Sequence, residues 1–170
     1  IVPGIALTLC VLAFNFVGFL AVYALQRMQG FLPWNPENLE ATTPHMAFNT
    51  AASFVTNTNW QSYGGESTMS YFSQMVGLTI HNFTSAAAGI AIAAALVRGI
   101  ARPSASTVGN FWTDMVRVTY CLLLPVSLVF ALVLVSQGMI ENFQPSIVAK
   151  TMESYTIPVA KTDAAGHPEL

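Results

Sequence analysis

Charged residues are scarce in this chain of 170 residues: Asp, Glu, Lys and Arg together make up 8%, whereas hydrophobic residues make up 54%. Soluble domains usually carry about 25% charged residues. Three runs lack any charged side chain, with His81 counted as neutral, and they cover residues 1–26, 67–97 and 118–140. Because a helix needs about 20 apolar residues to cross a bilayer, the sequence predicts an all-α integral membrane protein with three spans.

Other absences narrow the function. The two cysteines, Cys10 and Cys121, lie inside apolar runs without metal-type spacing, and we expect them to be packing residues. No basic patch suggests a nucleic-acid partner. The sequence also lacks a phosphate-cradling loop, an Asp-Lys-Thr-Gly phosphorylation motif and a nucleophile–base pair. We therefore expect no catalytic residues here and no ATP hydrolysis by this chain alone.

The apolar and polar segments follow the order of a re-entrant pore loop. Thr43 and Pro44 mark the start of a short helix, with a hydroxyl at the cap and proline at the first helical position. About 12 residues of helix rise only about 18 Å, which is half of a bilayer crossing. The expected elements are a span at 2–26, a half helix at 44–56, a filter loop at 57–65 and a span at 71–97.

Basic residues are concentrated after the second span. The segment 98–117 holds three arginines and one acid, whereas the rest of the chain holds three basic and seven acidic residues. The positive-inside rule predicts that this segment is a cytoplasmic loop and that the filter loop faces outside. The third span, 118–140, then runs outward, and 141–170 is expected to be a truncated outer loop of a longer protein.

The loop at 57–65 has the chemistry of a cation site. A cation that leaves water needs several oxygen ligands, which backbone carbonyls of small residues such as Asn57, Thr58 and Asn59 supply. The negative end of the half helix points at Asn57, and Gly64 and Gly65 are expected to let the chain turn outward. A second interpretation stays open, in which 44–56 is an interfacial helix and the loop only connects two spans.

The motif FNTAASFVTNTNWQSY, at residues 48–63, closely resembles the first pore loop of the potassium-binding subunit of bacterial high-affinity potassium-importing ATPases, the Kdp complexes. The resemblance continues on both sides of this motif and covers nearly the whole chain up to about Pro145. The run TNTNWQSY is long and specific. The sequence is therefore identified as a fragment from this family.

The resemblance implies a potassium-channel-like fold of four span–loop–span units. Residues 1–97 would be the first unit, and the span at 118–140 would begin the second. By motif, Asn57, Thr58 and Asn59 would form one quarter of a potassium filter, and Gln61 beside it would influence potassium affinity. Three further residues would be filter-adjacent, namely Trp60, Ser62 and Gly65.

The resemblance also implies a place and partners. The expected location is the bacterial inner membrane, in contact with lipid, with the loop facing outside. The expected partners are a P-type ATPase catalytic subunit, which hydrolyses ATP, and small accessory membrane subunits; the expected ligand is the potassium ion, with no organic cofactor. Potassium would pass from the filter to the pump subunit. Two alternatives stay open, a stand-alone channel or transporter of the pore-loop superfamily and a non-conducting scaffold. His81 receives no family role.

Overall fold

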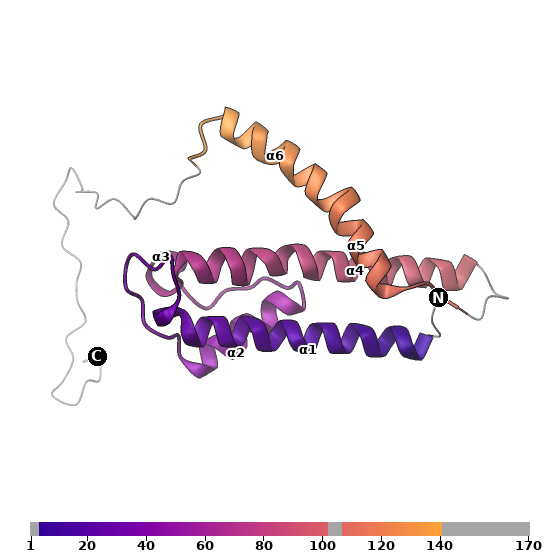
Figure 1. The fold of residues 1–170 in the computed structure, drawn as a ribbon, viewed down its shortest axis with the longest axis horizontal. Helices are drawn as coiled ribbons and strands as arrows, with labels where there is room; N and C mark the ends of the chain where they lie inside the picture. Colours follow the sequence, from indigo (N-terminus) through magenta and orange to yellow (C-terminus); the bar gives the residue numbers. More distant parts are fainter. Residues whose placement is uncertain (1–3, 102–106, 141–170) are drawn as a thin grey trace, which may run out of the picture.

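The computed structural model describes residues 4–101 and 107–140, and all regular structure in these residues is helical (Figure 1). Three stretches are long and apolar enough to cross a membrane: Gly4–Phe31, Ser73–Ala101 and Phe111–Ser136. They contain 28, 29 and 26 residues. A helix of that length rises about 39–44 Å, more than the roughly 30 Å of hydrocarbon. The predicted all-α membrane fold is confirmed.

The described elements form three spans and a short insertion between the first two. α1 is followed by one turn of 3-10 helix, and α4 and α6 are each preceded by a π-helical turn that continues directly into them. In chain order the elements are α1 (Gly4–Met28), η1 (Gln29–Phe31), α2 (Pro44–Val55), α3 (Gly65–Thr68), η2 (Ser73–Thr79), α4 (Ile80–Ala101), α5 (Phe111–Val118), η3 (Thr119–Leu123) and α6 (Leu124–Ser136).

The helix ends differ from the sequence-based boundaries around the predicted loop 98–117. α4 continues past Arg98 to Ala101, and α5 already begins at Phe111, so the third span starts before residue 118. Arg98 and Arg117, which bounded the predicted loop, lie within α4 and α5. The span then ends at Ser136, before the predicted limit of 140. The predicted outer segment 141–170 lies outside the described residues.

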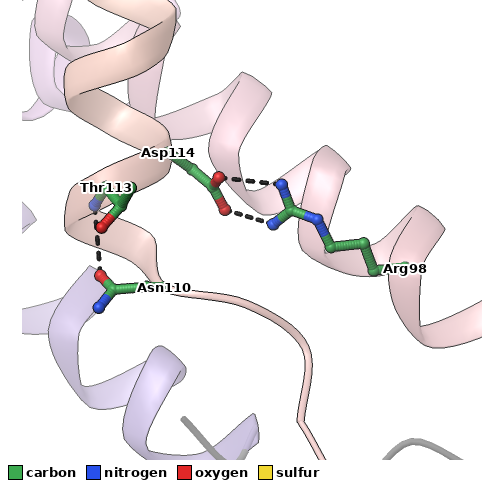
Figure 2. Close-up of polar contacts among 4 residues, drawn as sticks. All are labelled: Arg98, Asn110, Thr113 and Asp114. Atoms are coloured by element: carbon green, nitrogen blue, oxygen red, sulfur yellow. Dashed lines mark hydrogen bonds and ion pairs between the residues drawn. The ribbon is translucent and has the colours of Figure 1, made fainter. Parts of the chain in front are cut away.

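An ion pair explains how charges fit into these helix ends. The guanidinium of Arg98 on α4 donates to both carboxylate oxygens of Asp114 on α5, with Nη2 2.9 Å from Oδ1 (Figure 2). Asp114 is buried. The side chain of Asn110 caps α5 by accepting from the N–H of Thr113 at 3.2 Å. Pairing and capping therefore satisfy polar groups that the sequence pattern assigned to a loop.

Gly109 lets the chain pass close to this ion pair. Its φ of +120° lies in the region that favours glycine, and a Cβ here would collide with Nη1 of Arg98. The turn before α5 is thus shaped around the guanidinium.

Small residues let the helices approach one another. α4 buries Ala87, Ala88, Ala91 and Ala95 against α1 and α5. A second buried cluster joins α1, α2 and the start of the second span, and consists of Val22, Ala51, Phe54 and Leu78. α6 diverges from α4 (Figure 1) and buries no side chain in the described residues. The core of the described residues therefore lies between α1, α2, α4 and α5.

Replacing Asp114 by alanine is expected to destabilise the fold. The change leaves the Arg98 guanidinium without its hydrogen-bonded partner, and we expect the free energy of unfolding to fall by about 1–3 kcal/mol. Thermal unfolding of the complete subunit in detergent measures the loss. Glu66→Ala, which removes an exposed carboxylate from α3, is the control, and an equal melting temperature for the two variants would contradict the role of the pair.

Candidate ion-binding loop

The polar loop sits on a hairpin that starts beside the end of α1. The N–H of Thr42 donates to the carbonyl oxygen of Gln26 at 3.3 Å, which fixes the chain just before α2. Thr43 caps α2 by accepting from the N–H of Met46 at 3.4 Å, and Pro44 takes the first helical position. The hydroxyl-proline signal in the sequence thus marks the real start of the helix.

The chain returns to the same end of α1 after the loop. The N–H of Ser70 donates to Oε1 of Gln29 at 3.2 Å, directly after the short helix α3. At the other end of the hairpin, Oγ of Ser85 on α4 lies 3.3 Å from Oδ1 of Asn57. Ser85 is 12 residues beyond Ser73, or about 18 Å along the helix. The hairpin therefore reaches about halfway along the second span and turns back.

The amide groups of the loop are tied to the carboxyl end of α2. The N–H of Asn57 donates to Phe54 O at 3.2 Å, and those of Thr58 and Asn59 donate to Ser53 O at 3.0 and 3.3 Å. In a trans peptide the N–H and the preceding C=O point in opposite directions. The carbonyls of Thr56, Asn57 and Thr58 therefore point away from this end of α2.

These carbonyls have no hydrogen-bond donor in the part of the chain that the structure describes. The same is true of the carbonyl of Asn59, and residues 56–62 are all exposed in this chain. The carboxyl end of the 12-residue helix α2 adds partial negative charge beside them. A row of free carbonyl oxygens at a negative helix end is an arrangement that attracts a cation.

Two asparagines, and neither glycine, provide the unusual backbone of the loop. Asn57 and Asn59 both have a φ of 57°, and Thr58 between them does not have a positive φ. Asparagine tolerates the left-handed region better than most residues. The expectation that Gly64 and Gly65 would provide the unusual backbone angles is wrong, because Gly64 has a φ of −87° and Gly65, which opens the helix α3, does not have a positive φ either.

The side chains of the loop bond mainly to one another. Nδ2 of Asn59 donates to Oδ1 of Asn57 at 3.2 Å, and the hydroxyls of Thr56 and Thr58 lie 2.8 Å apart. These contacts hold the side chains along the loop. The carbonyl oxygens therefore remain the free ligands.

The filter-adjacent residues lie along the return from the tip. Gln61 is exposed, and its Nε2 donates to the Tyr63 hydroxyl at 3.3 Å. Ser62 accepts from Asn49 at 3.4 Å. The ring of Trp60 is half-exposed, whereas the carbonyl of Gly65 accepts from Gln74 at 3.0 Å. Gln61 is thus the longest polar side chain near the tip that is open to solvent in this chain.

The described residues contain no group of three His, Cys, Asp or Glu side chains that could hold a metal ion. Residues 56–62 carry no charged side chain, so the candidate ligands at the loop are neutral oxygens. Neutral carbonyl ligands in a row suit an alkali cation, whose hydration shell they replace.

Sequence comparison now identifies the family. The family model described as Potassium-transporting ATPase A subunit matches residues 5–167. The chain belongs to this family. The family expected from the motif at 48–63 is confirmed, and the match of the A-subunit family model extends beyond Pro145, where the resemblance was expected to end.

Curated relatives in the A-subunit family are named potassium-transporting ATPase potassium-binding subunit. The protein of Bordetella pertussis is 58% identical over 157 residues, which cover 92% of this chain and 26% of the relative. The protein of Ralstonia nicotianae is 56% identical over 158 residues, covering 93% and 27%. The protein of Chromobacterium violaceum is 54% identical over 157 residues, covering 92% and 26%. This chain thus spans roughly a quarter of the length of these relatives.

Sequence reasoning missed the residue that organises the loop of this A-subunit chain. Ser53 is buried, its carbonyl accepts two loop amides, and its hydroxyl donates to Trp60 O at 2.9 Å. The signal available in the sequence was a small hydroxyl residue in the last turn of a half helix, directly before a polar run. Ser53 joins both sides of the tip and fixes which way the peptide groups face.

The left-handed backbone conformation of Asn59 can be tested by comparing Asn59→Ala with Asn59→Gly in the complete subunit. Both changes remove the side-chain bond to Asn57, but only glycine adopts a positive φ without strain. We expect the alanine variant to be less stable than the glycine variant by about 1–2 kcal/mol. Thermal unfolding measures the difference.

The same pair of substitutions at Asn38 serves as the control, since its φ is 51° in the loop before α2. A similar difference there shows that the backbone is responsible. An alanine variant at Asn59 that equals the glycine variant would contradict the left-handed assignment.

Proposed function

We propose that residues 57–59 form one wall of a potassium filter, and that the complete subunit takes potassium from outside and delivers it to an ATP-hydrolysing partner. The main support for this proposal is the hydrogen bonding of the loop backbone. Its amides donate to α2, whereas the carbonyls of Asn57, Thr58 and Asn59 accept no hydrogen bond among the described residues. The name of the relatives, potassium-transporting ATPase potassium-binding subunit, supports potassium as the ion.

The proposal requires more walls than this chain contains. Free carbonyls at the depth of the hydrocarbon region are tolerated only where they face protein, water or an ion. The loop residues are exposed in this chain, so other segments of the complete subunit are needed to surround the ion. The family resemblance implies four such units, of which residues 4–101 contain one.

Charge distribution supports the orientation within the proposal. Arg98 and Arg117 lie at the end of the second span and the start of the third, and the positive-inside rule assigns this end to the cytoplasm. The hairpin opens at the other end of α1 and α4, which is then outside. A bacterial inner membrane is the location that fits this direction of uptake.

The partners in the proposal supply the chemistry that this chain lacks. A P-type ATPase catalytic subunit would hydrolyse ATP, and small accessory membrane subunits would complete the complex. The role of this chain is to hold and orient a dehydrated potassium ion by its carbonyl oxygens before the ion is passed on.

Gln61→Arg in the complete subunit tests the filter. A fixed positive charge close to the loop opposes a bound cation. We expect the potassium concentration for half-maximal ATPase activity of the purified complex to rise about tenfold, equivalent to about 1.4 kcal/mol. The complex should assemble normally, because Gln61 is exposed and bonds only to Tyr63.

Gln137→Arg is the matched control, since it makes the same substitution at an exposed glutamine that ends α6. It should leave the potassium dependence close to that of the wild type. An unchanged half-maximal concentration for Gln61→Arg in an assembled complex would refute the filter.

Cysteine labelling separates the filter from a scaffold that only connects spans. Cysteines placed one at a time at Asn57, Thr58 and Asn59 of the complete subunit should react slowly with bulky outside reagents, and potassium should slow them further. Rapid labelling whose rate does not depend on potassium supports the scaffold. Potassium protection in a complex whose ATPase does not respond to potassium supports the stand-alone channel.

A further inference from the structure

Gln29 is a fully buried glutamine at the point where α1 ends. It is the first residue of the 3-10 turn Gln29–Phe31, and none of its surface is exposed. A glutamine amide has two N–H donors and a carbonyl oxygen that accepts two bonds. All four positions are used in this structure.

The four bonds join the two limbs of the hairpin. We call residues 39–43 the first limb and residues 65–70 the second limb. Nε2 of Gln29 donates to Glu40 O at 2.6 Å in the first limb and to Thr68 O at 2.8 Å in the second limb. Oε1 accepts from the N–H of Ser70 at 3.2 Å and from the hydroxyl of Ser73 at 3.1 Å. One side chain thus connects α1, both limbs and the start of the second span.

The same region offers a contrasting glutamine. Gln26 is equally buried, and its Nε2 donates to Val22 O at 3.1 Å and to Ala47 O at 3.3 Å. Its Oε1 has no partner within the described residues. Gln26 therefore holds α1 to α2 and does not bond to the second limb.

The base and the tip of the hairpin are mechanically connected. The first limb leads directly into α2, whose last turn holds the loop amides through Ser53. The second limb leads into the span that carries Ser85, the contact of Asn57. A change in the separation of the limbs at Gln29 is therefore passed to both supports of the loop.

We propose that Gln29 is a positioning residue that sets how the two limbs hold the loop, and thereby the affinity and selectivity for the ion. This inference rests on the proposed filter function. Gln29 does not touch the ion; it acts through the limbs. The amide is suited to this role because two donors and one double acceptor meet two carbonyls, one N–H and one hydroxyl without any buried charge.

Gln29→Met tests this in the complete subunit, purified with its partners. Methionine keeps the length and the apolar stem but makes none of the four bonds. We expect the potassium concentration for half-maximal ATPase activity to rise about fivefold or more, the lower end of typical coupling between separate sites. The maximal rate should stay within about twofold, because the pump subunit is unchanged.

A second readout separates positioning from stability. The ratio of the half-maximal concentrations for rubidium and potassium should change in Gln29→Met, since a reshaped loop alters its fit to ions of different size. Gln26→Met, the matched control, should leave both the ratio and the potassium dependence near the wild-type values. Equal behaviour of the two methionine variants would overturn the role of Gln29.

If the Gln29→Met complex does not assemble, Ser73→Ala tests the positioning role of Gln29. This change removes the Ser73–Gln29 bond and leaves the Gln29 amide in place. A smaller rise in half-maximal potassium concentration is expected, and none would overturn the proposal. Gln61→Arg is measured in parallel. A shift for Gln61→Arg without one for Gln29→Met or Ser73→Ala overturns the role of Gln29 alone, whereas no shift for Gln61→Arg rejects the filter itself.

Discussion

A buried peptide group must find a hydrogen-bonding partner, and the hairpin between α1 and α4 is organised around that constraint. At membrane depth no water replaces a missing partner outside a pore or cavity. The loop meets the requirement for its donors by directing the amides of residues 57–59 to the end of α2. The carbonyls are left open, and this imbalance between satisfied donors and free acceptors is the basis of the cation site proposed for the loop.

The supports of the loop follow from the same constraint. The side chains of a glutamine, a serine and a threonine bond to backbone groups at or beside the hairpin, as Gln29, Ser53 and Thr42 show. Apolar packing completes the arrangement, because Ala51 and Phe54 of α2 lie against Val22 of α1. Neutral amides and hydroxyls make most of these bonds, and the half-buried guanidinium of Arg27 adds one by donating to the carbonyl oxygen of Thr42.

Much of the fold was readable in the sequence, because long apolar runs and a Thr-Pro helix start depend on local chemistry alone. The ends of the spans could not be predicted. Arg98 and Asp114 were assigned to a loop, but they pair across two helices, and this contact is not visible in the sequence. The position of the candidate loop was predicted by its polarity. Its left-handed residues were not, because asparagine accepts a positive φ without requiring it, and glycine was the more obvious choice. The roles of Ser53 and Gln29 were missed because they depend on hydrogen bonds that form only once the hairpin is folded.

The return of the hairpin to the side from which it starts affects how many times the described residues cross the membrane. In the proposed topology an insertion that comes back adds no crossing, so the three candidate spans of the described residues would place Gly4 and Ile140 on opposite faces of the membrane. In that proposed topology the shortness of α2 sets the side of the membrane on which each end of α4 and α6 lies. A helix long enough to cross at this point would invert α4, α5 and α6 and move Arg98 and Arg117 to the face opposite the proposed cytoplasmic one.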